Sequence, residues 1–216
     1  MLTLDVGGGE TPLRHLLVIG AHSDDIEIGC AGTVKRLIRD VPGLSVCWVV
    51  MSAHGDRIAE ARNSAEALLD GVADREIIIG SFRDGYLPYE GAAVKDQVEQ
   101  LKRVVPDLIL THYGRDAHQD HRLVSELTWN TFRDHMILEF EIPKYDGDLG
   151  TPNFFVRLDD ELARGKVDHL LEHFPSQHDR HWFTDELFRS LMRIRGMECN
   201  APSGYAEAFY CRKAAF

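Results

Sequence analysis

The chain has 216 residues, of which 44% are hydrophobic and 27% charged, and this composition is ordinary for one compact globular domain with a substantial core. The formal net charge of −11 argues against electrostatic binding to nucleic acid or to an anionic membrane surface, because both partners require a basic surface. A small, locally bound substrate suits such a chain better.

The sequence contains no segment that predicts membrane insertion or export. The longest apolar runs, such as Val46 to Met51, are far too short to span a bilayer, and the stretch from Met1 to Glu10 lacks the basic and apolar regions of a signal peptide. We therefore expect a cytoplasmic protein. Its four cysteines form no C-x-x-C pair, so neither a disulfide framework nor a thiolate zinc site is indicated.

The first two-thirds of the chain alternates short apolar runs with helical patterns. In chain order, the predicted elements are a strand over 16–19, a helix over 32–39, a strand over 45–51, a helix over 57–69, a strand over 76–79, a helix over 94–105, a strand over 108–110 and a helix over 120–132. Strands this short and apolar, separated by helices, favour a parallel sheet that helices cover on both faces. The predicted fold class is therefore α/β, with a mostly parallel, Rossmann-like sheet.

The last third of the chain has a different pattern. Strands are predicted over 138–142, 153–158 and 205–212, and helices over 160–173 and 185–195. No internal repeat, low-complexity tract or linker is present, so we expect residues 1–216 to form a single domain. Residues 136–216 should lie over the edge of the sheet and shape the substrate pocket.

The segment His22-Ser23-Asp24-Asp25 follows the first predicted strand. Carboxylates near a helix start are favoured by the exposed backbone N–H groups, which keep them ionised and ready to bind a cation. Taken alone, the segment fits equally well a helix start that is capped by Asp24 or Asp25 beside a hydrogen-bonded histidine.

The segment His118-Gln119-Asp120-His121 follows a separate strand and opens another helix. His118 and His121 are three residues apart on one helix face, and Asp120 between them can orient an imidazole through its second nitrogen. Both segments should emerge at the same edge of the sheet, where α/β folds place their chemistry. Together they supply the nitrogen and oxygen ligands of a catalytic zinc ion and spare acid/base groups, which predicts a metal-dependent amide hydrolase.

These residues resemble the motifs of the PIG-L/LmbE-like zinc N-deacetylases. The first family motif, (P/A)HPDD, is matched by Ala21-His22-Ser23-Asp24-Asp25, and the second motif, HxDH, is matched by His118-Gln119-Asp120-His121. The order and strand-then-helix contexts agree, and the similarity extends loosely through the first 135 residues. In the last third, the resemblance is weaker and rests on short segments such as Tyr205 to Phe209.

The resemblance implies a role for each motif residue. Three side chains would bind zinc, namely His22, Asp25 and His121. Asp24 would activate a water molecule, and His118 would polarise the amide carbonyl or stabilise the oxyanion. Asp120 would hold His118 in its tautomer. Iron, cobalt or manganese also suits a His/Asp/His ligand set.

Two positions depart from the family pattern. Ser23 replaces the usual proline, which loosens the turn without removing a ligand. Asp116 stands where some relatives carry a tyrosine thought to assist the oxyanion, and an aspartate there can bind a sugar hydroxyl or pair with His118.

Two further residues are candidates for substrate binding. Arg57 begins an R-x-x-E pattern whose arginine faces the substrate in the family, although an exposed ion pair with Glu60 fits equally well. Asp84 stands where relatives use an aspartate to grip a sugar hydroxyl, and it is also a natural turn residue before Gly85.

A second group of histidines is the strongest rival metal site. It comprises His169, His173, His178 and His181. The group lacks a carboxylate at a strand end and is interrupted by Pro175, so we expect a solvated or substrate-rim role.

The expected function is hydrolysis of the N-acetyl group of an amino-sugar conjugate of the N-acetylglucosamine type, which releases acetate and a free amine. One alternative is an amidase that cuts a larger acyl group from a thiol-sugar conjugate with the same residues. The other is a non-catalytic, nucleotide-binding or regulatory module, which lacks support because Gly20 to Asp25 offers no G-x-G-x-x-G phosphate cradle.

Overall fold

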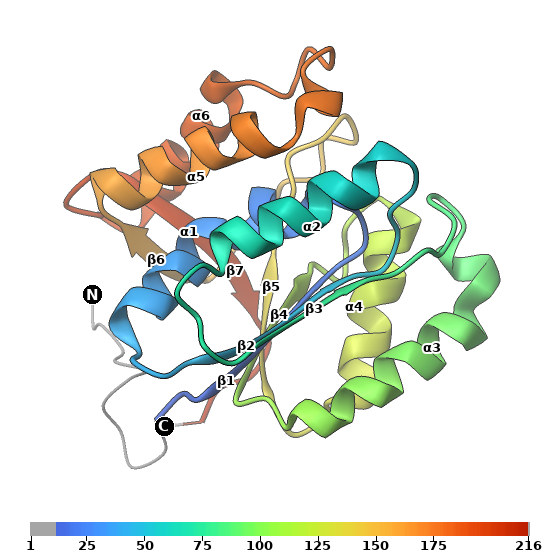
Figure 1. The fold of residues 1–216 in the computed structure, drawn as a ribbon. Coiled ribbons are helices and arrows are strands. Elements are labelled where there is room, and N and C mark those ends of the chain that lie inside the picture. Colours follow the sequence, from blue (N-terminus) through green and yellow to red (C-terminus); the bar gives the residue numbers. More distant parts are fainter. Residues whose placement is uncertain (1–11, 216) are drawn as a thin grey trace.

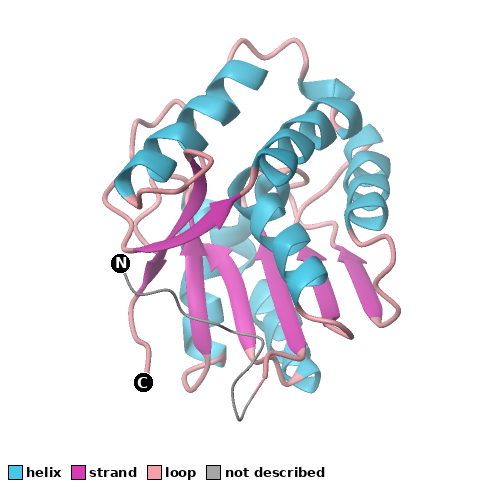
Figure 2. Ribbon diagram, turned by 90° about the vertical axis from the view of Figure 1, so that its left-hand side faces the viewer, coloured by secondary structure: helices cyan, strands magenta, loops and turns pink. Residues whose placement is uncertain are grey.

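The computed structural model describes residues 12–215, and over this range seven strands form one sheet in the order β3-β2-β1-β4-β5-β7-β6. The strands are β1 (His15–Gly20), β2 (Ser45–Val50), β3 (Arg75–Ile79), β4 (Leu108–His112), β5 (Met136–Phe140), β6 (Phe154–Leu158) and β7 (Tyr205–Cys211). β1 to β5 are parallel, whereas β7 pairs antiparallel with both β5 and β6 (Figure 2). The α/β fold with a mostly parallel sheet is thereby confirmed.

Helices cover both faces of this sheet (Figure 1). They are α1 (Asp25–Asp40), α2 (Asp56–Leu68), α3 (Gly91–Gln100), α4 (Gln119–Thr131), α5 (Asp160–His173) and α6 (Asp185–Glu198), with short 3-10 turns η1 (Leu87–Glu90), η2 (Leu101–Val104) and η3 (Pro175–Gln177). Leu16 and Val18 of β1 join a core with α1, α2, α5 and α6, while Leu17 and Ile19 join a second core with α3 and α4. This alternation explains why the central strands read as continuous apolar runs: side chains on both faces are buried.

The predicted start of the first helix was wrong. We expected it at Gly32, but α1 begins at Asp25 and contains non-helical dihedrals at Cys30, with φ −151° and ψ 17°. Two glycines flank this irregular residue, and they read as a turn in the sequence because glycine is unfavourable inside a helix. The helix therefore starts directly at the first motif and bends after its first turn.

The last third of the chain extends the sheet beyond β5. β7 pairs with β5 through Phe209 and Phe140, and β6 pairs with β7 on the other side. α5 and α6 pack on this extension, and α5 also contacts α1, so the C-terminal elements reach the helix that begins at the first motif.

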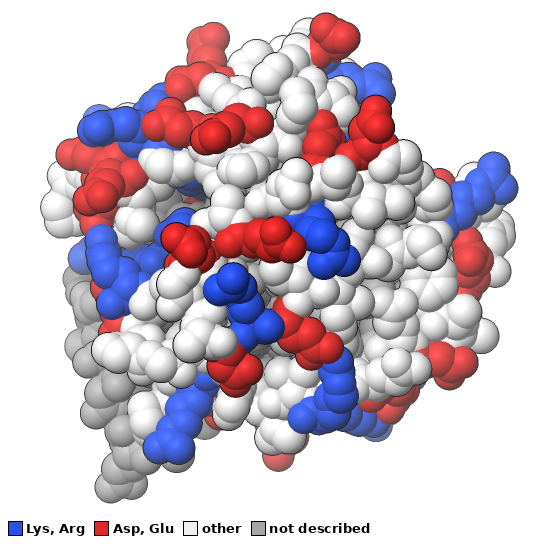
Figure 3. All heavy atoms as spheres, viewed as in Figure 1, with Lys and Arg blue, Asp and Glu red and all other residues white. Residues whose placement is uncertain are grey.

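The charged side chains visible on one face of the molecule are of mixed sign (Figure 3). Figure 3 shows acidic and basic side chains interspersed over one face of the molecule, and its described residues form no continuous basic area in that view. Within residues 12–215, every helix is too short or too polar to cross a membrane.

Candidate metal centre

The two sequence motifs meet at the carboxyl edge of two neighbouring parallel strands. β1 pairs with β4 in the register Leu16 to Leu108, so the turn after β1 and the start of α4 after β4 lie side by side. This is the edge at which open α/β sheets bind their ligands.

Three side-chain atoms from these motifs lie within 3.4 Å of one another. His22 Nδ1 is 3.1 Å from Asp25 Oδ2 and 3.2 Å from His121 Nε2, and the third distance, between His121 Nε2 and Asp25 Oδ2, is 3.4 Å. Ligands of a tetrahedral zinc ion lie about 3.3 to 3.5 Å apart, since each is about 2.0 to 2.1 Å from the metal. These three residues therefore fit one face of a zinc coordination sphere without rearrangement.

Each of the two imidazoles is oriented through its other nitrogen. His22 Nε2 lies 3.2 Å from Asp120 Oδ2 and 3.1 Å from Asp84 Oδ1, and His121 Nδ1 lies 3.0 Å from Asp116 Oδ2. Carboxylates in this outer position fix the ring orientation and raise the basicity of metal-binding histidines.

The electrostatics of the cluster favour a positive charge. Burial lowers the pKa of His121, but Asp25 and Asp116 more than offset this effect and raise it to about 9. Burial also opposes the ionisation of Asp25, yet the neighbouring histidines hold its pKa well below the usual range. The carboxylates thus keep protons on the rings at neutral pH, and a metal ion would replace those protons.

The side-chain carboxylate of Asp120 does not hold the ring of His118, contrary to our expectation. Its carboxylate accepts hydrogen bonds from the backbone N–H of Gly85 (2.7 Å) and Leu87 (3.2 Å) and faces His22. The ring of His118 is instead fixed by the backbone, because its Nδ1 accepts from the N–H of Asp120 at 3.3 Å as the N-cap of α4. Asp120 therefore links the loop after β3 to the proposed metal ligand His22.

The same contact defines the chemistry of His118. Burial lowers its pKa, so the ring is neutral, and with Nδ1 acting as an acceptor the proton resides on Nε2. The ring centroid lies 4.9 Å from that of His22 and 4.6 Å from that of His121. In this tautomer His118 presents an N–H donor beside the atoms of His22, Asp25 and His121, and its ring also forms a group with His22 and His121 that could hold a metal ion.

Asp116 is buried rather than open to a substrate. Only 2% of the residue is exposed, its Oδ1 accepts from the backbone N–H of His118, and its Oδ2 faces both the His121 ring and Lys144 Nζ at 2.9 Å. Burial opposes its ionisation, but His121 and Lys144 lower its pKa to about 2. The expected contact with a sugar hydroxyl is therefore not supported, and the expected pairing is with the ring of His121 rather than with that of His118.

Asp24 lies beside the ligand cluster and pairs with Arg57. Its Oδ1 is 2.7 Å from Arg57 Nη2, and burial raises its pKa while the guanidinium opposes that rise. Glu60 of the R-x-x-E pattern lies 3.9 Å from Arg57 and instead accepts two hydrogen bonds from Ser176. Arg57 thus contacts Asp24 and also lies within ion-pair distance of Glu60, and its contact with a substrate stays a prediction.

Asp84 is the accessible carboxylate of the cluster. Its side chain is 74% exposed although one oxygen lies 3.1 Å from His22 Nε2. It belongs to the loop that Asp120 holds through Gly85 and Leu87, and the neighbouring Tyr86 has a partly exposed ring with Arg83 stacked over it.

Two residues of the cluster, His112 and Lys144, were missing from the prediction. His112, the last residue of β4, accepts from the N–H of Ala21 at 2.9 Å, and its ring stacks on that of His121 with 4.0 Å between centroids. Lys144 binds both Asp116 and Asp148 from the loop after β5. A histidine at the carboxyl end of a central strand is a signal that could have been noticed, whereas Lys144 has no local signal.

The rival histidines do not assemble a metal site. His169 Nε2 lies 2.8 Å from Ser64 Oγ, His178 binds the Leu171 carbonyl, and His181 lies against Tyr145. Among the described residues, the groups of side chains able to hold a metal all lie around His22 and His121, and none includes these histidines.

Comparison with known proteins identifies the family. A family model described as PIG-L, GlcNAc-PI de-N-acetylase, matches residues 17–132. YaiS of Escherichia coli (strain K12), an uncharacterized deacetylase, is 28% identical over 147 residues that cover 60% of this chain and 75% of YaiS.

Solved structures share the fold at low sequence identity. The N,N'-diacetylchitobiose deacetylase of Pyrococcus horikoshii has a TM-score of 0.72 at 21% identity, covering 92% of this chain and 84% of that one. GalB, the 4-carboxy-2-hydroxymuconate hydratase of Pseudomonas putida KT2440, has a TM-score of 0.74 at 14% identity, covering 94% and 98%. Because a deacetylase and a hydratase share this fold, the fold alone does not define the reaction. The family model spans more than half of the chain and includes both motifs of the cluster, and the chain therefore belongs to the PIG-L family and is a deacetylase.

Proposed function

We propose that this deacetylase depends on a divalent metal, zinc in the first instance, and removes the N-acetyl group from an amino-sugar conjugate. The observation that carries the proposal is the separation of 3.1 to 3.4 Å among the ligand atoms of His22, Asp25 and His121. A zinc ion held there would act as a Lewis acid and would lower the pKa of a bound water molecule toward neutrality.

Asp24 acts as the general base in this proposal. Its carboxylate accepts a proton from the attacking water as the new carbon–oxygen bond forms, and later passes that proton to the amine as the carbon–nitrogen bond breaks. Burial raises the pKa of Asp24 toward the operating pH, and Arg57 at 2.7 Å keeps the carboxylate ionised. The pairing therefore supports a base that is both charged and able to accept a proton.

His118 acts as the donor to the carbonyl oxygen. Its neutral ring carries the proton on Nε2 and lies beside the rings of His22 and His121. Such an N–H group stabilises the negative charge that develops on the oxygen as water adds to the amide carbon. Because its tautomer is held by a backbone N–H, this donor does not depend on the charge of a neighbouring carboxylate.

An amino-sugar substrate is supported by the groups around the opening. Asp84 presents an exposed carboxylate, which is suited to neighbouring sugar hydroxyls, and Tyr86 offers a partly exposed aromatic ring two residues away. The family description names an N-acetylglucosamine-containing substrate, which agrees with this chemistry.

Two aspartate variants test the division of roles. Asp24→Asn should retain the metal and lose activity by on the order of a thousandfold, because the amide cannot accept a proton. Asp25→Asn should lose metal instead, since a ligand oxygen is replaced. Metal content per chain and amine release are measured on both proteins. The opposite pattern would mean that Asp25 is the base and Asp24 the metal ligand.

A substrate panel tests the sugar. Metal-loaded protein is assayed for amine release from free N-acetylglucosamine, from N-acetylhexosamines joined to a second sugar, nucleotide or lipid, and from a thiol-sugar amide. Conjugates should have the higher kcat/KM, because binding energy from the remote group can be used at the reacting amide. Equal kcat/KM values for free and conjugated sugars would refute the proposal that the substrate is a conjugate. A preference for the thiol-sugar amide would favour the alternative amidase.

A further inference from the structure

Helix α1 is interrupted one turn after the proposed metal ligand Asp25. Cys30 has φ −151° and ψ 17°, values outside the helical region, although residues on both sides are helical. In an unbroken helix the Gly32 N–H would donate to the Ile28 carbonyl. The interruption frees polar backbone groups in the buried interior, where unsatisfied groups are costly.

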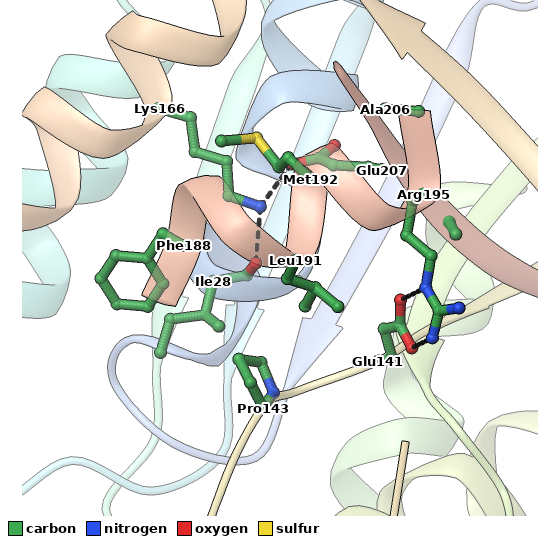
Figure 4. Close-up of a pocket in the computed structure, with 12 residues that line it drawn as sticks. Ile28, Glu141, Pro143, Lys166, Phe188, Leu191, Met192, Arg195, Ala206 and Glu207 are labelled. Carbon is green, nitrogen blue, oxygen red and sulfur yellow. Dashed lines mark hydrogen bonds and ion pairs between the residues drawn. The ribbon is translucent and has the colours of Figure 1, made fainter. Parts of the chain in front are cut away.

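A buried ion pair from the last third of the chain satisfies these groups. Lys166 Nζ donates to the Ile28 carbonyl at 2.6 Å, while the Glu207 carboxylate accepts from the N–H groups of Gly32 (3.0 Å) and Thr33 (2.6 Å). Lys166 and Glu207 are themselves 2.6 Å apart (Figure 4). The pair thus gives polar partners to backbone groups on both sides of the break and bridges the two segments of α1.

The fit around this pair is close. Lys166 is 6% exposed and Glu207 3%, and a Cβ atom at Gly32 would lie 2.6 Å from Leu158 Cδ1 and 3.1 Å from Glu207 Oε1. Glycine at position 32 therefore permits the carboxylate to approach the backbone. Glu207 acts as an internal N-cap for the second segment of α1, the position at which a negative charge is favourable.

We propose that Lys166 and Glu207 are positioning residues for the metal centre. By fixing both sides of the break, they set the direction of the first turn of α1, and that turn carries Asp25. A buried ion pair is often no more stabilising than apolar residues of the same volume, so general stability is a weak reason for its presence. The proposal rests on the proposed function, because the centre that is positioned is the proposed metal site.

The molecule contains a matched control. Arg195 and Glu141 form a second buried ion pair at 2.7 and 2.8 Å, lining the same small cavity (Figure 4). Arg195 also binds Glu198 and the Gly150 carbonyl, and thus holds α6 and the loop after β5 rather than α1. The loss of this pair should cost stability without moving Asp25.

The test compares Lys166→Met with Arg195→Met as folded proteins. Zinc affinity is measured by competition with a chelator, the thermal midpoint is measured without metal, and the absorption spectrum is recorded with cobalt. Both variants should unfold at a lower temperature than the wild type. Only Lys166→Met should bind zinc at least tenfold more weakly and show an altered cobalt spectrum, because outer positions of metal sites typically influence affinity by 10- to 100-fold.

Glu207→Gln covers the case in which Lys166→Met does not fold, since glutamine keeps the size and one acceptor oxygen. It should weaken zinc binding in the same direction. Equal zinc affinity in the wild type, Arg195→Met and the variants of the Lys166–Glu207 pair would overturn the positioning role and leave the proposed function intact. A wild-type chain that binds no metal would overturn both.

Discussion

The first two-thirds and the last third of the chain use buried charges in opposite ways. Around β1 and β4, atoms of His22, Asp25 and His121 that can bind a metal lie within 3.4 Å of one another. In the last third, Lys166 lies at hydrogen-bonding distance from Glu207. Arg195 lies at hydrogen-bonding distance from Glu141, the residue that follows β5. Buried charges that already have partners hold the scaffold, whereas charges that a ligand must complete mark the site.

The largest expected effect is loss of the metal from the proposed centre. His121→Ala should bind almost no zinc, because one of three ligands is removed, whereas His169→Ala should retain one ion per chain, because His169 contacts Ser64 in the scaffold. Elemental analysis of both purified proteins measures this difference. Full metal content in folded His121→Ala would remove this residue from the ligand set.

Loss of the proposed hydrogen-bond donor His118 should have the next largest effect. His118→Ala should lower kcat by about a hundredfold while zinc content stays at the wild-type level, which is the usual cost of removing one oxyanion donor. Steady-state amine release and metal analysis on the same preparation test this. If the variant lost its metal as well, His118 would belong with the ligands.

Lys144 connects the two regions, because its side chain extends from the loop after β5 to Asp116. Lys144→Met should weaken zinc binding by about tenfold, since Asp116 loses the cation that holds it against His121. Lys95→Met is the control, because Lys95 binds Glu99 and Thr131 on the surface of α3 and α4. Chelator competition that gives the same affinity for both variants would show that Lys144 does not act on the centre.

The smallest effect concerns pH and the metal-free protein. The pKa of His121 is about 9 in the folded chain and near 6.5 in the unfolded chain, so its stabilising charge is fully present below about pH 6.5 and is lost as the pH rises through 9. The thermal midpoint of the metal-free protein should fall by a few degrees over this range, while that of the zinc-loaded protein changes less. Parallel curves for the two forms would contradict the prediction.

Much of the fold, and the meeting of the two motifs, could be predicted because the signals are local. β1 and β4 are continuous apolar runs, and the two motifs follow them directly, so a parallel sheet brings His22 and His121 together. The roles of Asp120 and Asp116 were not predictable in the same way. Their carboxylates face three or more groups each, and only the folded geometry determines which partner each one contacts.

The break in α1 could not be predicted either. Its glycines favoured a later helix start, and the residues that stabilise it lie far away in the sequence: Lys166 is 138 residues from Ile28, and Glu207 is 175 residues from Gly32. Hydrophobic periodicity reports which face of an element is buried, but it carries no information on such distant polar contacts.

This separation affects the order of events while the protein is being synthesised. A ribosome releases the N-terminal segments first, and β1 and α1 can begin to form long before β7 has been translated. Until then α1 lacks the carboxylate of Glu207, which receives two of its N–H groups across 175 residues of chain. Closing so distant a contact is slow compared with forming a helix. The nascent chain therefore contains the residues of the proposed metal site early, whereas their final arrangement forms late, so we expect the proposed site to bind metal only after the polypeptide is complete.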